Sequence, residues 1–270
     1  MAAVSDILRT LPKLPPEQQR TLDTMDEAFK KQNEDGSSID ERGRVANIGA
    51  GVLFCKVAEQ NLFIALGQLK KKDARNGMYA SFSGGAEVKD FSGPSASPVF
   101  ATACRELGEE LGPLIPLSTF REAVDQPTTV VGVNKGFPHF VNPIFLVKST
   151  DEINDAIETS FKETKEIKRI RWVDAKTIIE SAEAVQIIYD ALCKTFIEEN
   201  AERLKEQWGP NLSDQEFKDR LNKEIRNDPR LKAARDGVVI GRAQGGSVVQ
   251  IAPYSARSIL ELRDFFPFPK

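Results

Sequence analysis

The sequence has little histidine, little cysteine and no long hydrophobic run. A single histidine, His139, among 270 residues excludes a histidine-rich zinc site and any mechanism that needs two imidazoles. The three cysteines, Cys55, Cys104 and Cys193, stand in apolar patterns without paired spacing, which predicts buried, reduced thiols. No apolar stretch approaches the roughly 18 residues that span a bilayer. We therefore expect neither a disulfide framework nor a membrane protein.

An excess of charge of one sign is also missing. The net charge of −3 and a pI near 5.5 argue against stable nucleic-acid binding driven by phosphate contacts. The first residues, Met1 to Arg9, lack the apolar core of a secretion signal, and with the unpaired cysteines this predicts a cytoplasmic location. Since 40% of the residues are hydrophobic and 29% are charged, we expect an ordinary globular protein.

What the sequence does contain is a dense acidic turn between Arg105 and Gly112. In a helix, Glu106, Glu109 and Glu110 would share one side at spacing i, i+3, i+4 and would repel each other, so a bound cation is expected. Oxygen ligands suit Mg²⁺ or Mn²⁺, which also bind substrate phosphate oxygens. On charge pattern alone, a solvated acidic surface is the alternative. The other side of this helix would be apolar and carry Phe100, Cys104, Leu107 and Leu111.

This acidic run resembles the second half of the box of the Nudix hydrolases. The family's box reads G-x5-E-x7-R-E-U-x-E-E-x-G-U, with U aliphatic, and the sequence matches it from Arg105 to Gly112, with Pro113 at the last aliphatic position. Upstream, Ser81-Phe82-Ser83-Gly84-Gly85 is similar to the F-P-G-G strand end of the family. Strand-like segments also stand in the family's order around the box, at residues 49–55, 62–67 and 170–174.

The resemblance implies the fold and the domain organisation. We expect an α/β fold, a Nudix-like α/β/α sandwich with a mixed sheet, over residues 45–196. Residues 1–44 would form an N-terminal helical arm, and residues 197–270 a C-terminal extension of helices and a β-hairpin packed on the core. In that extension a helix is predicted up to Trp208, and Ser213 with Glu216 has the spacing of a capping box at the next one.

The first half of the box departs from the family pattern. The segment before Arg105 is longer than in the family, and Ser97 stands where the early box glutamate is expected. Arg105 therefore needs another partner, for which Glu87 and Asp90 are the candidates. Ser97 is followed by Pro98, which is a favourable start for a helix.

The resemblance also implies roles for single residues. Glu109 and Glu110 would bind the metal, Glu106 would be a ligand or the base, and the Gly85 carbonyl a further ligand. Many members add an acid from a loop before the late tryptophan strand, where Glu166 stands, with Glu163 as the second choice. With Glu106 and Glu109, Glu166 completes the predicted catalytic residues. A bound Mg²⁺ or Mn²⁺ would polarise a phosphoryl oxygen and lower the pKa of a bound water.

Substrate contacts are predicted from less specific signals. Lys70, in the basic stretch 70–75, would lie beside the substrate phosphates together with Arg105, and Phe137 could stack on a base. A solvated lysine loop and a core phenylalanine are the respective alternatives. Pro127 stands close to the place where members acting on ADP-ribose often carry a proline.

The predicted function is that of a magnesium-dependent pyrophosphohydrolase. Its substrate would be a small-molecule nucleotide, a nucleoside diphosphate linked to another group, such as ADP-ribose or a nucleotide sugar. Nucleoside triphosphates are the alternative substrates. A non-catalytic ligand-binding or regulatory module is the alternative class, because the first half of the box is altered. A homodimer is compatible with the sequence but not required by it.

Overall fold

One mixed β-sheet organises the molecule. The computed structural model describes residues 4–34, 39–41, 43–92, 95–133, 142–209 and 212–265. Nine strands within these ranges form the sheet. Seven of them are neighbours in the order β5 (Val130–Val133), β6 (Pro143–Lys148), β1 (Arg44–Ala58), β2 (Asn61–Leu69), β3 (Tyr79–Ala80), β9 (Val248–Ile251) and β8 (Val239–Arg242). The other two are β4 (Phe82–Glu87), which pairs with β1, and β7 (Ile167–Asp174), which pairs with β2. The β1–β6 and β3–β9 pairs are parallel and the others are antiparallel.

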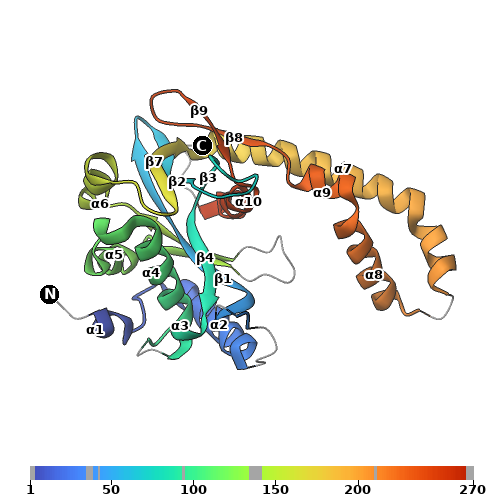
Figure 1. Cartoon of the computed structure of the whole chain (residues 1–270), viewed down its shortest axis with the longest axis horizontal. Helices are drawn as coiled ribbons and strands as arrows, with labels where there is room; N and C mark the ends of the chain where they lie inside the picture. Colours follow the sequence, from blue (N-terminus) through green and yellow to red (C-terminus); the bar gives the residue numbers. More distant parts are fainter. Residues whose placement is uncertain are drawn as a thin grey trace.

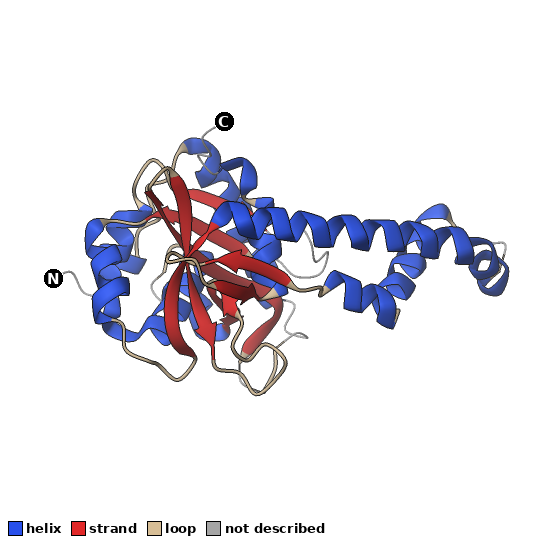
Figure 2. Cartoon of the chain, turned by 90° about the horizontal axis from the view of Figure 1, so that it is seen from above, coloured by secondary structure: helices blue, strands red, loops and turns tan. Residues whose placement is uncertain are grey.

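Helices cover both faces of this sheet (Figures 1 and 2). They are α1 (Val4–Leu8), α2 (Pro16–Glu34), α3 (Val88–Ser92), α4 (Pro98–Leu111), α5 (Leu117–Val124), α6 (Asp151–Asp155), α7 (Ala175–Trp208), α8 (Asp214–Asn227), α9 (Pro229–Arg235) and α10 (Pro253–Glu261), with the short turns η1 (Gly112–Leu114), η2 (Ala156–Ser160) and η3 (Arg263–Phe265). Within the described ranges, no helix has both the length and the apolar character needed to cross a membrane.

Two cores lie on opposite faces of the sheet because side chains alternate along its central strand. From β1, Val52 and Phe54 join the core beneath α2, α4 and α5, whereas Leu53 and Cys55 join the core beneath α7 and α10. Every one of these four side chains is buried. The α/β/α sandwich with a mixed sheet is therefore confirmed.

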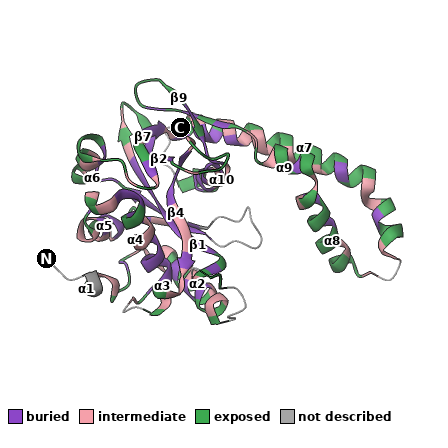
Figure 3. Ribbon diagram, in the orientation of Figure 1, coloured by how far each residue is buried: buried purple, intermediate pink, exposed green. Residues whose placement is uncertain are grey.

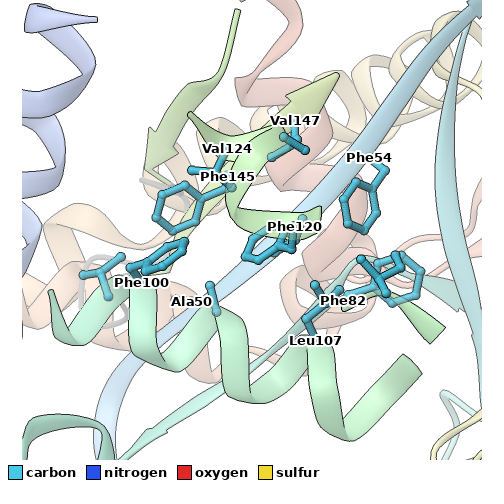
Figure 4. Packing of buried hydrophobic residues seen from close by; sticks show 14 of the residues in the cluster. Ala50, Phe54, Phe82, Phe100, Leu107, Phe120, Val124, Phe145 and Val147 are labelled. Atoms are coloured by element: carbon cyan, nitrogen blue, oxygen red, sulfur yellow. The ribbon is translucent and has the colours of Figure 1, made fainter. Parts of the chain in front are cut away.

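Stacked phenylalanines fix α4 to the sheet (Figure 4). Phe100 of α4 stacks on Phe120 of α5, with ring centroids 5.8 Å apart, and meets Phe145 of β6 edge-on at 5.8 Å. All three rings are fully buried. Since this apolar side is held against the sheet, the acidic side of the same helix is turned away from this core.

The predicted start of α4 is confirmed, and α2 is attached to it. Ser97 is the N-cap, its hydroxyl accepts a hydrogen bond from the Phe100 N–H at 3.0 Å, and Pro98 is the first helical residue. The Ser97 hydroxyl donates to Asp26 of α2 at 2.9 Å, and the Val99 N–H donates to the same carboxylate at 3.0 Å. The helix predicted as an N-terminal arm thus packs into the sandwich.

Asp26 should make the stability depend on pH. Burial raises the pKa of Asp26 from its ordinary range to about 6, although the hydrogen bonds from Val99 and Ser97 favour the charged form. The folded state therefore binds the proton more tightly than the unfolded chain, and this contribution is complete below about pH 4 and lost as the pH rises through 6. We expect Asp26→Asn to become more stable relative to wild type between pH 4 and 7, by about 2 kcal/mol.

Urea unfolding at pH 4, 5.5 and 7 measures this difference. Glu27→Gln, on the exposed side of the same helix, is the matched loss of one carboxylate. If the difference in unfolding free energy between Asp26→Asn and wild type stays constant from pH 4 to 7, the raised pKa of Asp26 is contradicted.

One continuous helix, α7, joins the predicted core to the C-terminal extension. α7 runs for 34 residues, through the predicted boundary at residues 196 and 197, so the helix predicted up to Trp208 is a continuation of the core's closing helix. No proline or glycine interrupts it, and it ends at Gly209, whose φ is 95°. The C-terminal half of α7 extends away from the sheet and is largely exposed (Figure 3).

The C-terminal elements fold back along α7 to the sheet. α8 begins with the predicted capping box of Ser213 and Glu216, and α8 and α9 share a small core with α7. β8 and β9 form the predicted hairpin. The hairpin is joined to the main sheet because Ile251 of β9 pairs with Tyr79 of β3. This pairing brings α10 next to the start of β4, because Ser81 before β4 is hydrogen-bonded to Ser255 of α10.

Candidate functional site

One cavity, with a volume of about 510 Å³, gathers most of the predicted site residues. Its walls come from β4, α4, the loop before β7 and the first turn of α10. The acidic lining residues are Glu106, Glu109, Glu110 and Glu166, and the basic ones are Arg44, Lys71 and Arg75. Leu69, Ser83, Gly84, Gly85, Asn142 and Tyr254 complete the lining. A cavity that contains both carboxylates and cations can hold a divalent metal and a phosphate group together.

Glu110 is the most unusual group in this cavity. Its side chain is buried, with 3% of the residue exposed, and the Ser83 N–H donates a hydrogen bond to the carboxylate. Among the residues that the structure describes, the Oε2 atom has no hydrogen-bond partner. Burial raises the pKa of Glu110 well above its ordinary value, and the charges of Glu106 and Glu166 raise it further. A buried anionic oxygen without a partner is costly, and a bound cation would satisfy it.

Glu106 lies against the backbone of the glycine pair. A Cβ atom added at Gly84 would lie 2.2 Å from its Oε2, so only glycine leaves room for this carboxylate. Arg105 Nη1 donates to Glu106 Oε1 at 2.7 Å. Burial raises the pKa of Glu106, although Arg105 opposes this shift.

Glu109 stands at the rim, with 45% of its side chain exposed. It lies 3.3 Å from Arg105 Nη1 and 3.8 Å from Lys89 Nζ. The three acids of the α4 turn therefore line one cavity at different depths.

The basic stretch after β2 contributes a different lysine from the predicted one. Lys70 pairs with Glu163 at 2.6 Å and donates to the Thr164 carbonyl at 2.9 Å, and it is absent from the cavity lining. Lys71 lines the cavity and its Nζ lies 2.7 Å from Glu166 Oε2. The predicted acid Glu166 is therefore present in the cavity and held there by Lys71.

Arg105 lies behind the acids rather than in the cavity lining. Its side chain is 10% exposed, and its Nε and Nη2 donate to the two oxygens of Asp90 at 3.0 and 3.1 Å. Nη2 also donates to the Gly85 carbonyl at 2.6 Å. Asp90 thus takes the place of the missing early box glutamate, with Glu87 at 3.7 Å from Arg105 as a second acid. The geometry gives Arg105 the role of positioning Glu106 and Gly85.

The oxygen ligands of this site fit a hard divalent cation. Glu106, Glu110 and Glu166 repel each other, and Glu110 Oε2 lacks a partner. However, among the described residues no three His, Cys, Asp or Glu side chains are close enough together to form a complete metal site. The fit therefore rests on the donor chemistry and on the unpartnered oxygen of Glu110.

Comparison with known proteins gives matches among solved structures alone. No family model matches the sequence, and neither does any curated protein. A Nudix hydrolase from Alicyclobacillus acidocaldarius is 15% identical, with a TM-score of 0.36 over 51% of this chain and 83% of that chain. An Ap4A hydrolase from C. elegans is 12% identical, with a TM-score of 0.31 over 49% of this chain and 83% of that one.

The chain is similar in structure to Nudix hydrolases. The Nudix domain of Shewanella oneidensis NrtR in complex with ADP ribose is a further match, 14% identical, with a TM-score of 0.30 over 55% of this chain and 86% of that one. NrtR in complex with a 27mer DNA is 12% identical, with a TM-score of 0.31 over 78% and 96% of the two chains. At these identities the likeness concerns the fold.

Several residues that line this cavity, among them Asn142 and Tyr254, were not predicted from the sequence. Asn142 is 5% exposed and its Oδ1 has no partner among the described residues, whereas Tyr254 comes from α10. Neither belongs to a local motif, so no sequence signal pointed to them. Phe137 lies outside the described residues, and its stacking role stays a prediction.

Gly84→Ala should displace Glu106 without unfolding the protein. The added methyl group would collide with the end of a flexible side chain, which can move away. We expect Mg²⁺ affinity to fall about tenfold, the size of effect typical when groups that orient a ligand are disturbed. Calorimetric titration with Mg²⁺ measures it. Gly108→Ala, on α4 with nothing within 4 Å of its added Cβ, is the control and should bind like wild type. Equal affinities of all three proteins would contradict the prediction.

Proposed function

We propose that this protein is a magnesium-dependent hydrolase that cleaves the diphosphate bond of a nucleoside diphosphate linked to another group, such as ADP-ribose or a nucleotide sugar. The observation that carries the proposal is Glu110, a buried carboxylate whose Oε2 has no partner in the described parts of the chain and which lines the same cavity as Glu106, Glu109 and Glu166. A site that serves only stability has no reason to bury such an oxygen.

The residues of the cavity would have two roles, to bind the metal and to accept a proton. Glu106, Glu109, Glu110 and the Gly85 carbonyl would hold Mg²⁺ or Mn²⁺, which supplies Lewis-acid activation of the phosphoryl group. Burial raises the pKa of Glu106, which suits it to accept a proton from the attacking water. Glu166, held by Lys71, is the second candidate for that role.

The basic residues of the cavity suit the substrate's phosphates. Arg75 is oriented by Asp73, whose carboxylate accepts from its Nε at 3.1 Å. Lys71 lies in the same cavity, so both cations could bind phosphoryl oxygens. A small nucleotide, rather than a nucleic acid, is the proposed ligand because the net charge of the chain is −3.

One observation favours a second candidate, a ligand-binding or regulatory module without turnover. The Gly85 carbonyl, a proposed metal ligand, already accepts a hydrogen bond from Arg105 at 2.6 Å. If Arg105 competes with the metal for this oxygen, binding of a nucleotide could persist while hydrolysis is lost.

A substrate panel with and without Mg²⁺ tests the proposal. We expect Mg²⁺-dependent release of a nucleoside monophosphate from ADP-ribose or a nucleotide sugar, and a loss of turnover on the order of a hundredfold in Glu109→Gln, because the variant removes charge from the metal's ligands. Cleavage of nucleoside triphosphates alone would support the alternative substrate class. Thermal stabilisation by a compound that is never cleaved would favour the binding module.

A further inference from the structure

The C-terminal segment is built into the site and does more than cover the core. The Ala252 N–H donates to the Tyr79 carbonyl at 2.8 Å, which continues the β3–β9 pairing to the start of α10. Ser255, in the first turn of α10, accepts a hydrogen bond from the Ser81 N–H at 3.0 Å. Ser81 directly precedes β4, the strand that carries the glycine pair. The position of α10 is therefore fixed relative to the catalytic acids.

A row of hydroxyl groups strengthens this connection. Ser255 Oγ lies 3.0 Å from Ser81 Oγ, which lies 3.2 Å from Ser83 Oγ. Ser83 lines the cavity, and its N–H donates to Glu110. Ser81 and Ser255 are both buried, at 1% and 0% exposure, so the contact between them lies in the interior of the protein.

Tyr254 is the side chain that this anchored turn places in the cavity lining. Its hydroxyl lies within electrostatic reach of Glu110 and Arg75, two other lining residues. Burial raises the pKa of Tyr254, and the nearby negative charge of Glu110 raises it further. A hydrogen bond from the Ser255 side chain opposes this rise. The hydroxyl accepts that bond and stays protonated at neutral pH, so its proton is available to donate to a ligand.

The neighbours of this hydroxyl decide what it would bind. Arg75 and Lys71 are cations of the same cavity, and with Tyr254 they form a set of donors. Phosphoryl oxygens accept from such donors, whereas a metal ion does not bind to them. We propose that Tyr254 is a substrate-binding residue supplied by the C-terminal segment, and that its hydroxyl donates to a phosphoryl oxygen of the substrate's diphosphate group beside Arg75. This inference rests on the proposed function for the identity of the ligand.

Binding of imidodiphosphate, the P–N–P analogue of a diphosphate, tests the inference without turnover. Calorimetry in Mg²⁺ is expected to show about tenfold weaker binding for Tyr254→Phe, which keeps the ring and loses the donor. Tyr189→Phe, on α7 and outside the cavity lining, is the matched control and should bind like wild type. Urea unfolding checks that Tyr254→Phe is folded.

The outcomes separate this inference from the proposed function. Equal binding by Tyr254→Phe and wild type, or no binding by wild type, would overturn it. If wild type binds imidodiphosphate, Tyr254→Phe binds it more weakly and no substrate is cleaved, the hydrolase proposal fails while the role of Tyr254 stands. With an active enzyme, Tyr254→Phe should raise KM about tenfold and change kcat little, because a ground-state contact is lost.

Discussion

Glu110→Gln is expected to lower turnover by on the order of a hundredfold and to make the metal-free protein more stable. Glu110 is buried beside Glu106 and Glu166, and its Oε2 lacks a partner within the described ranges, so its charge costs folding free energy. An amide of the same shape removes that charge. We expect the free energy of unfolding in EDTA to rise by about 1–3 kcal/mol.

The same variant should respond differently to metal. Mg²⁺ should stabilise the wild type and leave Glu110→Gln nearly unchanged, because binding to the folded state adds stability only where the site exists. Urea unfolding at pH 8 with EDTA and with Mg²⁺ gives both quantities. Glu122→Gln, on the exposed side of α5, is the control for the loss of one glutamate. A variant that is less stable than wild type in EDTA would show that the charge of Glu110 is satisfied by the protein.

The parts of the fold that the sequence predicted correctly depend on short-range patterns. The start of α4 at Ser97 and Pro98 and the capping box at Ser213 involve residues three positions apart or fewer. The hairpin of β8 and β9 is also local, because its paired residues, from Arg242 and Val248 to Val239 and Ile251, are close in the sequence. Such features are encoded by neighbouring residues, so a single sequence is enough to find them.

The partner of Arg105 could be predicted only as a choice between two acids. Both Glu87 and Asp90 come near it, but Asp90 makes the two-pronged contact because α3 turns its carboxylate toward Thr102 and Arg105. The sequence shows the need for a partner but not the orientation of that short helix.

The contribution of the C-terminal segment could not be predicted, because it depends on contacts between distant residues. Ser81 and Ser255 are 174 positions apart, and their hydrogen bond holds the turn that places Tyr254 in the cavity lining.

The environment of Ser97 could not be predicted from the sequence for the same reason. The position of Ser97 in the box suggests that a glutamate would be tolerated there, but the side chain is 1% exposed and donates to Asp26, so Ser97→Glu would bury two carboxylates together.

Arg105→Ala is expected to be the most destabilising of the substitutions considered, at about 3–5 kcal/mol of unfolding free energy. Arg105 is the common partner of Asp90, Glu106 and the Gly85 carbonyl, and its side chain is 10% exposed. Its removal leaves the buried Asp90 and the half-buried Glu106 without the guanidinium that they share. Breaking such a pair costs more than a surface ion pair contributes, because the remaining charge stays desolvated.

Arg105→Lys separates charge from geometry. A lysine keeps the positive charge but cannot contact Asp90 and Gly85 at once through a planar fork, so we expect an intermediate loss of stability. Urea unfolding compares both variants with Arg169→Ala, which removes one exposed arginine bonded to Gln68 and should cost less than about 1 kcal/mol. If Arg105→Ala were as stable as that control, the network beneath the acids would not hold Glu106 in place, and the positioning role of Arg105 would be wrong.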